Sequence, residues 1–321
     1  MKDSNHTPTP KQARMTELLD RLASTEGVHH STVLDGVKLM RSNHHRPRTP
    51  VLYDPSIVVV GQGRKRGYLG DQQYIYDAHN YLVLTVPMPF ECETEANPKE
   101  PLLAFSVRVD MIVLNELLMK MDPRSLPKPA DAARGIYATP MNEGLTDAAI
   151  RLLESMLDPA EAKVLGPSIM REITYRVLCG ANGGTLRELM SVNGRVGQIQ
   201  RAIERMHAEC DRPLDIQTLA DEVGISASAF HHKFKALTAT SPVQYLKTIR
   251  LHKAKMLMLN EGITAGAAAE RVGYESASQF SREFKRFFGD SPVQEVAKMR
   301  GYMGMERPSQ TNKTALAALE S

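Results

Sequence analysis

The sequence contains no tryptophan, only three cysteines and no long apolar run. The cysteines, Cys92, Cys179 and Cys210, are too far apart for the paired spacing of a metal or redox motif, so we interpret them as ordinary thiols of a reducing compartment. No apolar stretch approaches the length of a membrane span, and residues 1–6 lack the apolar core of a signal peptide. These absences predict a cytoplasmic protein without a membrane partner.

A charge excess of one sign is also nearly absent, because the net charge of the 321-residue chain is only +3. The balance differs along the chain, which is long enough for two domains. Residues 1–192 contain 22 basic and 23 acidic residues, whereas residues 193–321 contain 18 basic and 14 acidic residues. The basic excess therefore lies in the C-terminal part.

That C-terminal part contains an internal repeat of about fifty residues, between Pro213 and Val296. Residues 219–230 align with residues 268–280 after one inserted residue in the second copy. Further along, Ser241-Pro-Val-Gln244 recurs as Ser291-Pro-Val-Gln294. The two copies are therefore expected to fold in the same way.

Each copy of the repeat predicts a helix-turn-helix. Gly224 and Gly273 suit the left-handed end of a first helix, and Ser226 and Ser276 suit the N-cap of a second one. The second helix of each copy carries two phenylalanines four residues apart on one face: Phe230 with Phe234, and Phe280 with Phe284. These rings are expected to face the core, so the opposite face of each second helix points outward.

The outward faces of the two second helices are polar and partly basic. They carry Ser228, His231, His232 and Lys235 in the first copy, and Ser278, Gln279, Arg282 and Arg286 in the second. Such side chains read base edges in a major groove or hold phosphates beside it. Any amphipathic helix has a polar outer face, but two copies in one chain favour DNA binding.

The segment between the two copies predicts a long basic helix. Ser241-Pro242 suits a helix start, and an apolar helical pattern continues to Asn260. Residues 226–260 contain six lysines or arginines and no acidic residue. We interpret this basic tract as a surface for the phosphate backbone.

The second copy resembles the AraC/XylS family of transcriptional regulators. The resemblance is carried by residues 271–292, Arg-Val-Gly-Tyr-Glu-Ser-Ala-Ser-Gln-Phe-Ser-Arg-Glu-Phe-Lys-Arg-Phe-Phe-Gly-Asp-Ser-Pro. It implies a DNA-binding domain of two helix-turn-helix units joined by a long helix, with double-stranded promoter DNA as the partner and RNA polymerase as a further partner.

Side-chain chemistry and the resemblance together give two sets of expected DNA contacts. The expected base contacts are Ser228, His231, His232, Ser278, Gln279 and Arg282, and the expected phosphate contacts are Lys235, Ser241, Gln244, Lys247, Lys285, Arg286 and Ser291. Arg282 has the clearest chemistry, because a guanidinium group reads guanine O6 and N7. Helix capping explains Ser241 and Ser291 as well as a phosphate contact does, and Lys247 is equally explained as a solvated charge. His231 and His232 leave the base preference of the first unit open.

The N-terminal part alternates short β-rich runs with glycine-containing turns, which predicts an antiparallel barrel. The runs are 37–41, 56–60, 73–76, 81–86 and 102–109. Residues 53–67 and 76–87 resemble the cupin-like N-terminal domain of one AraC-family branch, which is taken to sense a small molecule. The predicted fold class is α+β, with a cupin-like antiparallel β-barrel and flanking helices followed by an all-α domain of two helix-turn-helix units.

Helical patterns follow at residues 111–121, 146–157 and 168–179. Family members commonly dimerise through helices of this domain, so a homodimer is expected. Packing of these helices on the barrel within one chain explains their apolar faces equally well. The expected division is a disordered start at 1–10, a sensing and dimerisation domain at 11–180, a linker at 181–194, a DNA-binding domain at 195–302 and a flexible tail at 303–321.

Two other groups of residues were weighed as sites. The pairs His29-His30 and His44-His45 lack the spacing of a metal motif and are read as surface histidines of flexible segments, so no metal or cofactor is expected. Gly61-Gln-Gly-Arg-Lys-Arg-Gly67 is read as a glycine-rich hairpin, with Arg64, Lys65 and Arg66 at its solvated tip. The alternative is that these three cations contact an anionic effector.

The sequence therefore predicts a DNA-binding transcriptional regulator that is not an enzyme and responds to an unidentified small molecule in its barrel. One alternative is a cupin-type metal-binding sensor or enzyme with an accessory DNA-binding module. Another is a DNA-binding protein without an effector, whose barrel serves only for dimerisation.

Overall fold

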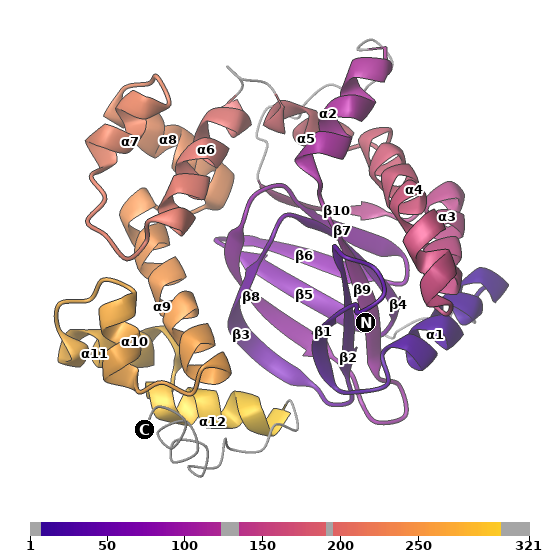
Figure 1. Cartoon of the computed structure of the whole chain (residues 1–321), viewed down its shortest axis with the longest axis horizontal. Coiled ribbons are helices and arrows are strands. Elements are labelled where there is room, and N and C mark those ends of the chain that lie inside the picture. Colours follow the sequence, from indigo (N-terminus) through magenta and orange to yellow (C-terminus); the bar gives the residue numbers. More distant parts are fainter. Residues whose placement is uncertain (1–7, 123–134, 191–194, 303–321) are drawn as a thin grey trace, which may run out of the picture. The chain divides into compact units, whose positions relative to one another are not determined.

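The computed structural model describes residues 8–122, 135–190 and 195–302. The chain divides into two compact units, residues 1–249 and residues 250–321. The first unit contains the β-sheet, its covering helices and the first copy of the repeat (Figure 1). The second unit contains the second copy.

The first unit is built around one antiparallel sheet. Its strands are β1 (Gly27–His30), β2 (Val37–Ser42), β3 (Arg46–Tyr53), β4 (Ser56–Gln62), β5 (Arg64–Leu69), β6 (Gln72–Asp77), β7 (Asn80–Leu84), β8 (Met88–Glu95), β9 (Leu102–Arg108) and β10 (Ile136–Pro140). The strand order is β1-β2-β9-β4-β7-β6-β5-β8-β3, and β10 pairs with β7. This half-barrel confirms the predicted N-terminal fold (Figure 1).

Helices α1 (Pro10–Leu22), α2 (Met111–Lys120), α3 (Glu143–Ser155), α4 (Pro159–Leu178) and α5 (Gly183–Leu189) accompany the sheet. Helix α1 packs on β4, where Thr16 Oγ1 donates a 3.0 Å hydrogen bond to the carbonyl of Gly61, and it also lies against α3 (Figure 1). Because helices cover one face of β4 and the barrel interior covers the other, six of its seven residues are buried.

The two copies of the repeat form the expected helix pairs. The first copy comprises α6 (Arg195–Ala208), α7 (Ile216–Glu222) and α8 (Ala227–Thr238), and α9 (Pro242–Asn260) is one continuous helix. The second copy comprises α10 (Ala265–Arg271), α11 (Ala277–Phe288) and α12 (Pro292–Tyr302). No helix of the described residues is long and apolar enough to cross a membrane.

The turn between the helices has the same chemistry in both copies. Gly224 and Gly273 adopt φ of 73° and 79°, the left-handed region that favours glycine. The next residues, Ile225 and Tyr274, return hydrogen bonds of 3.1 Å and 3.0 Å to the carbonyls of Ala220 and Ala269. Ser226 and Ser276 then cap the second helices, as the sequence predicts.

The core of the second unit contains a buried ion pair. Lys255 on α9 and Glu295 on α12 are 6 % and 5 % exposed, and their Nζ and Oε1 atoms lie 3.4 Å apart. The Lys255 ammonium also lies 4.0 Å from the centre of the Phe288 ring. The pKa of Lys255 is lowered because burial penalises its charge, although Glu295 opposes that shift.

Several sequence-based expectations need correction. Arg64, Lys65 and Arg66 are not a hairpin tip: they lie on β5, which pairs with β6 on one side and β8 on the other, and Gly63, with φ of 79°, separates β5 from β4. Alternation along β5 therefore buries Lys65. His29 and His30 lie in strand β1 rather than in a flexible segment.

Three helix expectations also change. Helix α4 begins at Pro159, because Asp158 caps it and a proline at the first position suits a helix start. Thr9 and Pro10 belong to the start of α1, where Thr9 and Gln12 form a capping box. Residues 183–189 of the expected linker form α5. The expected disorder of residues 1–7 and 303–321 lies outside the described residues, and the domain limits remain predictions.

Candidate nucleic-acid interface

In the first unit, α8 exposes the side chains that the sequence predicts to contact DNA. Ser228, His231, His232 and Lys235 are all exposed. On the opposite face, Phe230 and Phe234 are fully buried with ring centres 5.5 Å apart, and Phe234 also meets Tyr245 edge-on. Replacing such a phenylalanine with alanine costs about 3–5 kcal/mol. The core therefore fixes which face of α8 points outward.

The exposed face of α8 borders a cleft of about 440 Å³. It is lined by His231, His232, Lys235 and Ala236 of α8 and by Ser241, which precedes α9. The structure thus brings together four of the residues expected to contact DNA. Ala236 was missed by sequence reasoning, although its position four residues after His232 places it on the same face.

Ser241, which precedes α9, caps this helix and keeps a hydroxyl hydrogen that it can donate. Ser241 Oγ accepts a 3.3 Å hydrogen bond from the backbone N–H of Gln244, so capping is its structural role here. Its hydroxyl hydrogen can still be donated to an anion. The Gln244 side chain is exposed, whereas Lys247 is half-buried and has other interactions in this structure.

In the second unit, α11 exposes Ser278, Gln279, Arg282, Lys285 and Arg286. Its opposite face buries Phe280, Phe284 and Phe288, which stack in sequence with ring centres 5.5 Å and 4.5 Å apart. Helices α8 and α11 thus present equivalent faces, each fixed by buried aromatic rings.

Polar contacts on α11 arrange part of its reading face. Gln279 Nε2 donates a 3.3 Å hydrogen bond to Glu283 Oε1, and Glu283 Oε2 accepts a 2.9 Å hydrogen bond from the Tyr274 hydroxyl. Burial and this bond raise the pKa of Tyr274, so its hydroxyl remains a donor. Among the described residues, Arg282, Lys285 and Arg286 form no ion pair, so their cationic groups are available to an anionic partner.

At the start of α12, Ser291 donates two hydrogen bonds to the side-chain oxygen of Gln294. Ser291 Oγ donates to Gln294 Oε1 at 2.6 Å, and the same oxygen accepts from the Ser291 backbone N–H at 3.2 Å. This arrangement stabilises the helix start. Gln294 therefore accepts the hydrogens of both donor groups of Ser291, and the phosphate contact of Ser291 remains a prediction.

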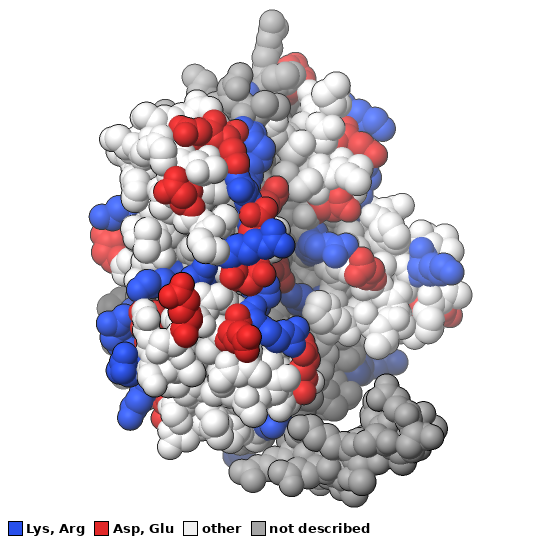
Figure 2. All heavy atoms as spheres, turned by 60° about the vertical axis from the view of Figure 1, so that its left-hand side comes forward, with Lys and Arg blue, Asp and Glu red and all other residues white. Residues whose placement is uncertain are grey.

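The basic tract of residues 226–260 does not form one surface. Lys255 is buried against Glu295, and Lys233 donates a 2.8 Å hydrogen bond to Gln198 Oε1 of α6. The interpretation of this tract as a surface for the phosphate backbone was therefore wrong for Lys255, because the helical rotation turns this residue into the core. In Figure 2, basic and acidic side chains are interspersed on the face shown, so individual contacts matter more than a single basic field.

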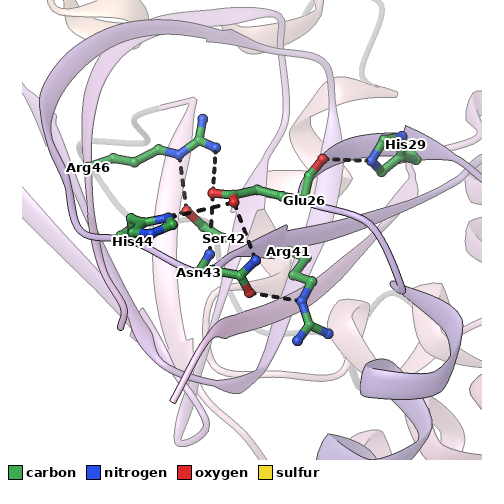
Figure 3. Close-up of polar contacts among 7 residues, drawn as sticks. All are labelled: Glu26, His29, Arg41, Ser42, Asn43, His44 and Arg46. Atoms are coloured by element: carbon green, nitrogen blue, oxygen red, sulfur yellow. Dashed lines mark hydrogen bonds and ion pairs between the residues drawn. The ribbon is translucent and has the colours of Figure 1, made fainter. Parts of the chain in front are cut away.

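The histidine pairs of the N-terminal domain belong to ordinary polar contacts. Glu26 lies at the centre of a cluster (Figure 3), where it accepts hydrogen bonds from Asn43 and Arg46 and lies 3.7 Å from His44 Nδ1. The Arg46 guanidinium and the Asn43 N–H lower the pKa of Glu26, although burial opposes that shift. Within the described ranges, no three His, Cys, Asp or Glu side chains form a group that could hold a metal ion.

A second cleft, of about 460 Å³, lies beside α1 in the first unit. It is lined by Thr9 to Gln12 and Met15, by Val60 and Gly61 of β4, by Ala78, and by Glu143 and Thr146 of α3. Lys11 bridges to Glu143 and Asp147 at 2.9 Å and 2.6 Å beside it. Sequence reasoning gave no signal for this cleft, because its lining comes from four separate segments.

An antiparallel half-barrel in one chain with two helix-turn-helix copies defines a helix-turn-helix transcriptional regulator. Residues 33–185 match the model of the AraC-type transcriptional regulator N-terminus, and residues 219–297 match a helix-turn-helix domain model. The chain belongs to the AraC family of transcriptional regulators. The matched families are regulators and not enzymes.

Among curated proteins, the chain is 33 % identical over 95 residues to the HTH-type transcriptional regulator AlkR of Acinetobacter baylyi. The matched segment covers 30 % of this chain and 31 % of AlkR. The matched segments span between about a third and a half of the length of such relatives. Among solved structures, ToxT of Vibrio cholerae with a bound unsaturated fatty acid matches with a TM-score of 0.57 at 12 % identity, covering 81 % of this chain and 93 % of ToxT.

ToxT bound to (E)-4-(8-methylnaphthalen-1-yl)but-3-enoic acid matches with a TM-score of 0.53 at 10 % identity, covering 80 % of this chain and 98 % of ToxT. At these identities the likeness concerns the fold. It confirms the two-domain fold of a half-barrel followed by a helical helix-turn-helix domain.

Proposed function

We propose that this protein binds specific sites on double-stranded DNA through α8 and α11 and thereby regulates transcription. The observation that carries the proposal is the equivalence of the two exposed helix faces. Each is polar, each follows a capped turn of the same geometry, and each is held by buried phenylalanines. An α-helix of this kind fits the major groove of B-form DNA.

The contacts divide between reading and positioning. Ser228, His231 and His232 on α8, and Ser278, Gln279 and Arg282 on α11, contact base edges, with Arg282 on guanine. Lys235, Lys285 and Arg286, together with Ser241, Gln244, Lys247 and Ser291 near the starts of α9 and α12, contact phosphates and set the register on the duplex. The operator is expected to contain two short motifs about one helical turn, ~34 Å, apart.

We further propose that the N-terminal domain binds a small-molecule effector. Support comes from the half-barrel fold and from the two ToxT structures, which contain an unsaturated fatty acid and an aryl butenoic acid. Both of those ligands are carboxylic acids. Among the described residues, the cleft beside α1 and the inward-facing side of the half-barrel are two places where we expect an effector.

A second copy of the chain is the proposed partner of α4. Val164, Leu165 and Tyr175 of this helix are 72 %, 44 % and 43 % exposed, while its other face is buried against the rest of the unit. An apolar strip beside a packed face suits dimerisation. Sedimentation equilibrium of Val164→Lys against the unchanged protein tests it, and an unchanged mass distribution overturns it.

The DNA-binding proposal is tested by selecting sequences from a random double-stranded library with the full-length protein. The expected result is enrichment of two linked motifs. A triple variant, Ser278→Ala/Gln279→Ala/Arg282→Ala, should retain the motif read by α8 and lose the other. Recovery of no shared motif by the folded wild-type protein would overturn the proposal.

A further inference from the structure

Lys65 is a buried cation in the interior of the half-barrel. It is 8 % exposed and alternates along β5 with Arg64 and Arg66, which face outward. Its register partners on the neighbouring strands are Tyr76 of β6 and Thr94 of β8, and both are buried. The ammonium group therefore lies among inward-facing side chains.

The groups around the Lys65 ammonium are neutral. Its Nζ atom lies 5.7 Å from the centre of the Tyr53 ring and interacts with the Tyr53 hydroxyl. The Tyr76 hydroxyl shares a 3.2 Å hydrogen bond with Cys92 Sγ in the same cluster. In the part of the chain that the structure describes, Lys65 has no ion pair with a carboxylate.

The nearby acidic residues are already paired on the outer face of the sheet. Asp77 lies 3.2 Å from Arg64, Glu95 pairs with Arg66, and Glu93 accepts a 2.7 Å hydrogen bond from the Tyr68 hydroxyl. None of these carboxylates is available to a side chain on the inner face. The sheet thus neutralises its outer cations and leaves the inner one without a counter-charge.

Two effects act on the charge of Lys65. Burial opposes the charge, whereas the hydrogen bond between the ammonium group and the Tyr53 hydroxyl favours it. Arg46 of β3, which is paired with Glu26, also acts against the charge of Lys65. A buried ammonium without an anion is unfavourable, so the cluster is suited to receive one.

We propose that the effector carries a carboxylate or a comparable oxyanion, which binds Lys65 Nζ and the hydroxyl groups of Tyr53 and Tyr76 inside the half-barrel. The ammonium and two phenol groups supply charge-assisted hydrogen bonds to such an anion. Phe90, whose ring meets Tyr53 edge-on at 5.0 Å, and Met88 offer an apolar surface for the rest of the molecule. This inference rests on the proposed effector function of the barrel.

Tyr53 places one side of the cluster on the edge strand β3. β3 stands last in the strand order and pairs with β8 on one side. Tyr53, the last residue of β3, is only partly buried.

The test uses acid and amide pairs of matched shape with the full-length protein: hexanoate with hexanamide, benzoate with benzamide, and 2-naphthoate with 2-naphthamide. Binding is measured by calorimetry. At least one acid is expected to bind roughly tenfold or more tightly than its amide, because only the acid neutralises the ammonium. In Lys65→Met that preference should disappear.

Lys38→Met is the matched control, because Lys38 lies on β2 and pairs with Asp54 at 2.8 Å on the exposed side. It should keep the acid preference. Tyr53→Phe and Tyr76→Phe remove one hydroxyl each and should weaken acid binding several-fold, and they carry the test if Lys65→Met fails to fold.

Any one of three results overturns the inference. The wild-type protein binds acid and amide equally, Lys65→Met binds the acid as tightly as the wild type does, or none of the acids binds. DNA selection by the same preparation reports on the DNA-binding proposal independently. A protein that selects its motifs but shows no acid preference loses only the inference about the effector.

Discussion

The hydroxyl of Tyr245 donates a 2.8 Å hydrogen bond to the carbonyl of Pro87, and His207 Nε2 lies 2.9 Å from the same hydroxyl. Tyr245 lies in the first turn of α9, and Pro87 immediately precedes β8, which also carries Cys92 of the Lys65 cluster. Burial raises the pKa of Tyr245, so its hydroxyl stays a donor. Within the first unit, one side chain therefore links the helix-turn-helix to a strand of the barrel.

Replacing Tyr245 with phenylalanine should destabilise the first unit by about 1–3 kcal/mol, because the Pro87 carbonyl and His207 lose a buried partner. The change is measured as a lower midpoint of urea unfolding. Tyr175→Phe, at a side chain that is 43 % exposed, is the control and should leave the midpoint unchanged. Equal midpoints for the two variants would show that the Tyr245 bond contributes nothing.

Replacing Arg282 with alanine should weaken binding to the selected operator by about 1–3 kcal/mol and relax the preference at one base position. Titration of the operator and of a set of single-base variants measures both effects. Arg271→Ala is the control, because Arg271 lies on α10 of the same unit and pairs with Glu261. An unchanged sequence profile for Arg282→Ala would remove this residue from the base contacts.

Replacing Lys235 with alanine should weaken binding to all sequences alike and lower the slope of log K against log salt by about 1, because one phosphate contact releases about one counterion. Affinity is measured at several salt concentrations. Lys99→Ala, an exposed lysine in the segment between β8 and β9, should not change the slope. A change in sequence preference at constant slope would instead place Lys235 on a base.

Replacing Glu295 with glutamine should destabilise the second unit by about 3–5 kcal/mol, because the buried Lys255 ammonium loses its counter-charge. The double variant Lys255→Met/Glu295→Leu should recover most of that stability, since two apolar side chains fill the same space. Hydrogen exchange of α11 amides in the full-length protein measures the effect. If the double variant is as unstable as the single one, the charge pair does not explain the loss.

Acid should destabilise the second unit through His252. This side chain is 5 % exposed and packs edge-on against Phe287 and Phe288, and burial lowers its pKa to about 3. Since the folded state disfavours the charged form, stability is complete above the unfolded pKa of about 6.5 and is lost as the pH falls towards the folded value. From about pH 7.5 to about pH 5 the loss should be roughly 2 kcal/mol.

Hydrogen exchange of α11 amides across this pH range measures the loss, after correction for the intrinsic pH dependence of exchange. His252→Leu, which cannot be protonated, should remove most of the dependence between about pH 5 and about pH 7.5. The same pH profile in wild type and His252→Leu would assign the effect to another group.

Much of the helical repeat could be predicted from the sequence, because its signals are local. The glycine at each turn, the serine caps and the phenylalanines four residues apart each act within a few residues, and the structure shows all of them in place. The exposed faces of α8 and α11 follow from the same spacing. The strands were harder to predict: β5 was mistaken for a turn, because glycine and three consecutive cations read as a solvated hairpin.

Short-range patterns and residue types were sufficient to predict the duplicated helix-turn-helix, the antiparallel barrel class of the N-terminal part and the family. Which cations face solvent depends instead on contacts between distant segments. Lys255 pairs with Glu295 forty residues away, and strand pairing of β5 with β6 and β8 turns Lys65 inward among Tyr53, Tyr76 and Cys92. Such surroundings come from segments distant in the chain, so no local pattern encodes them.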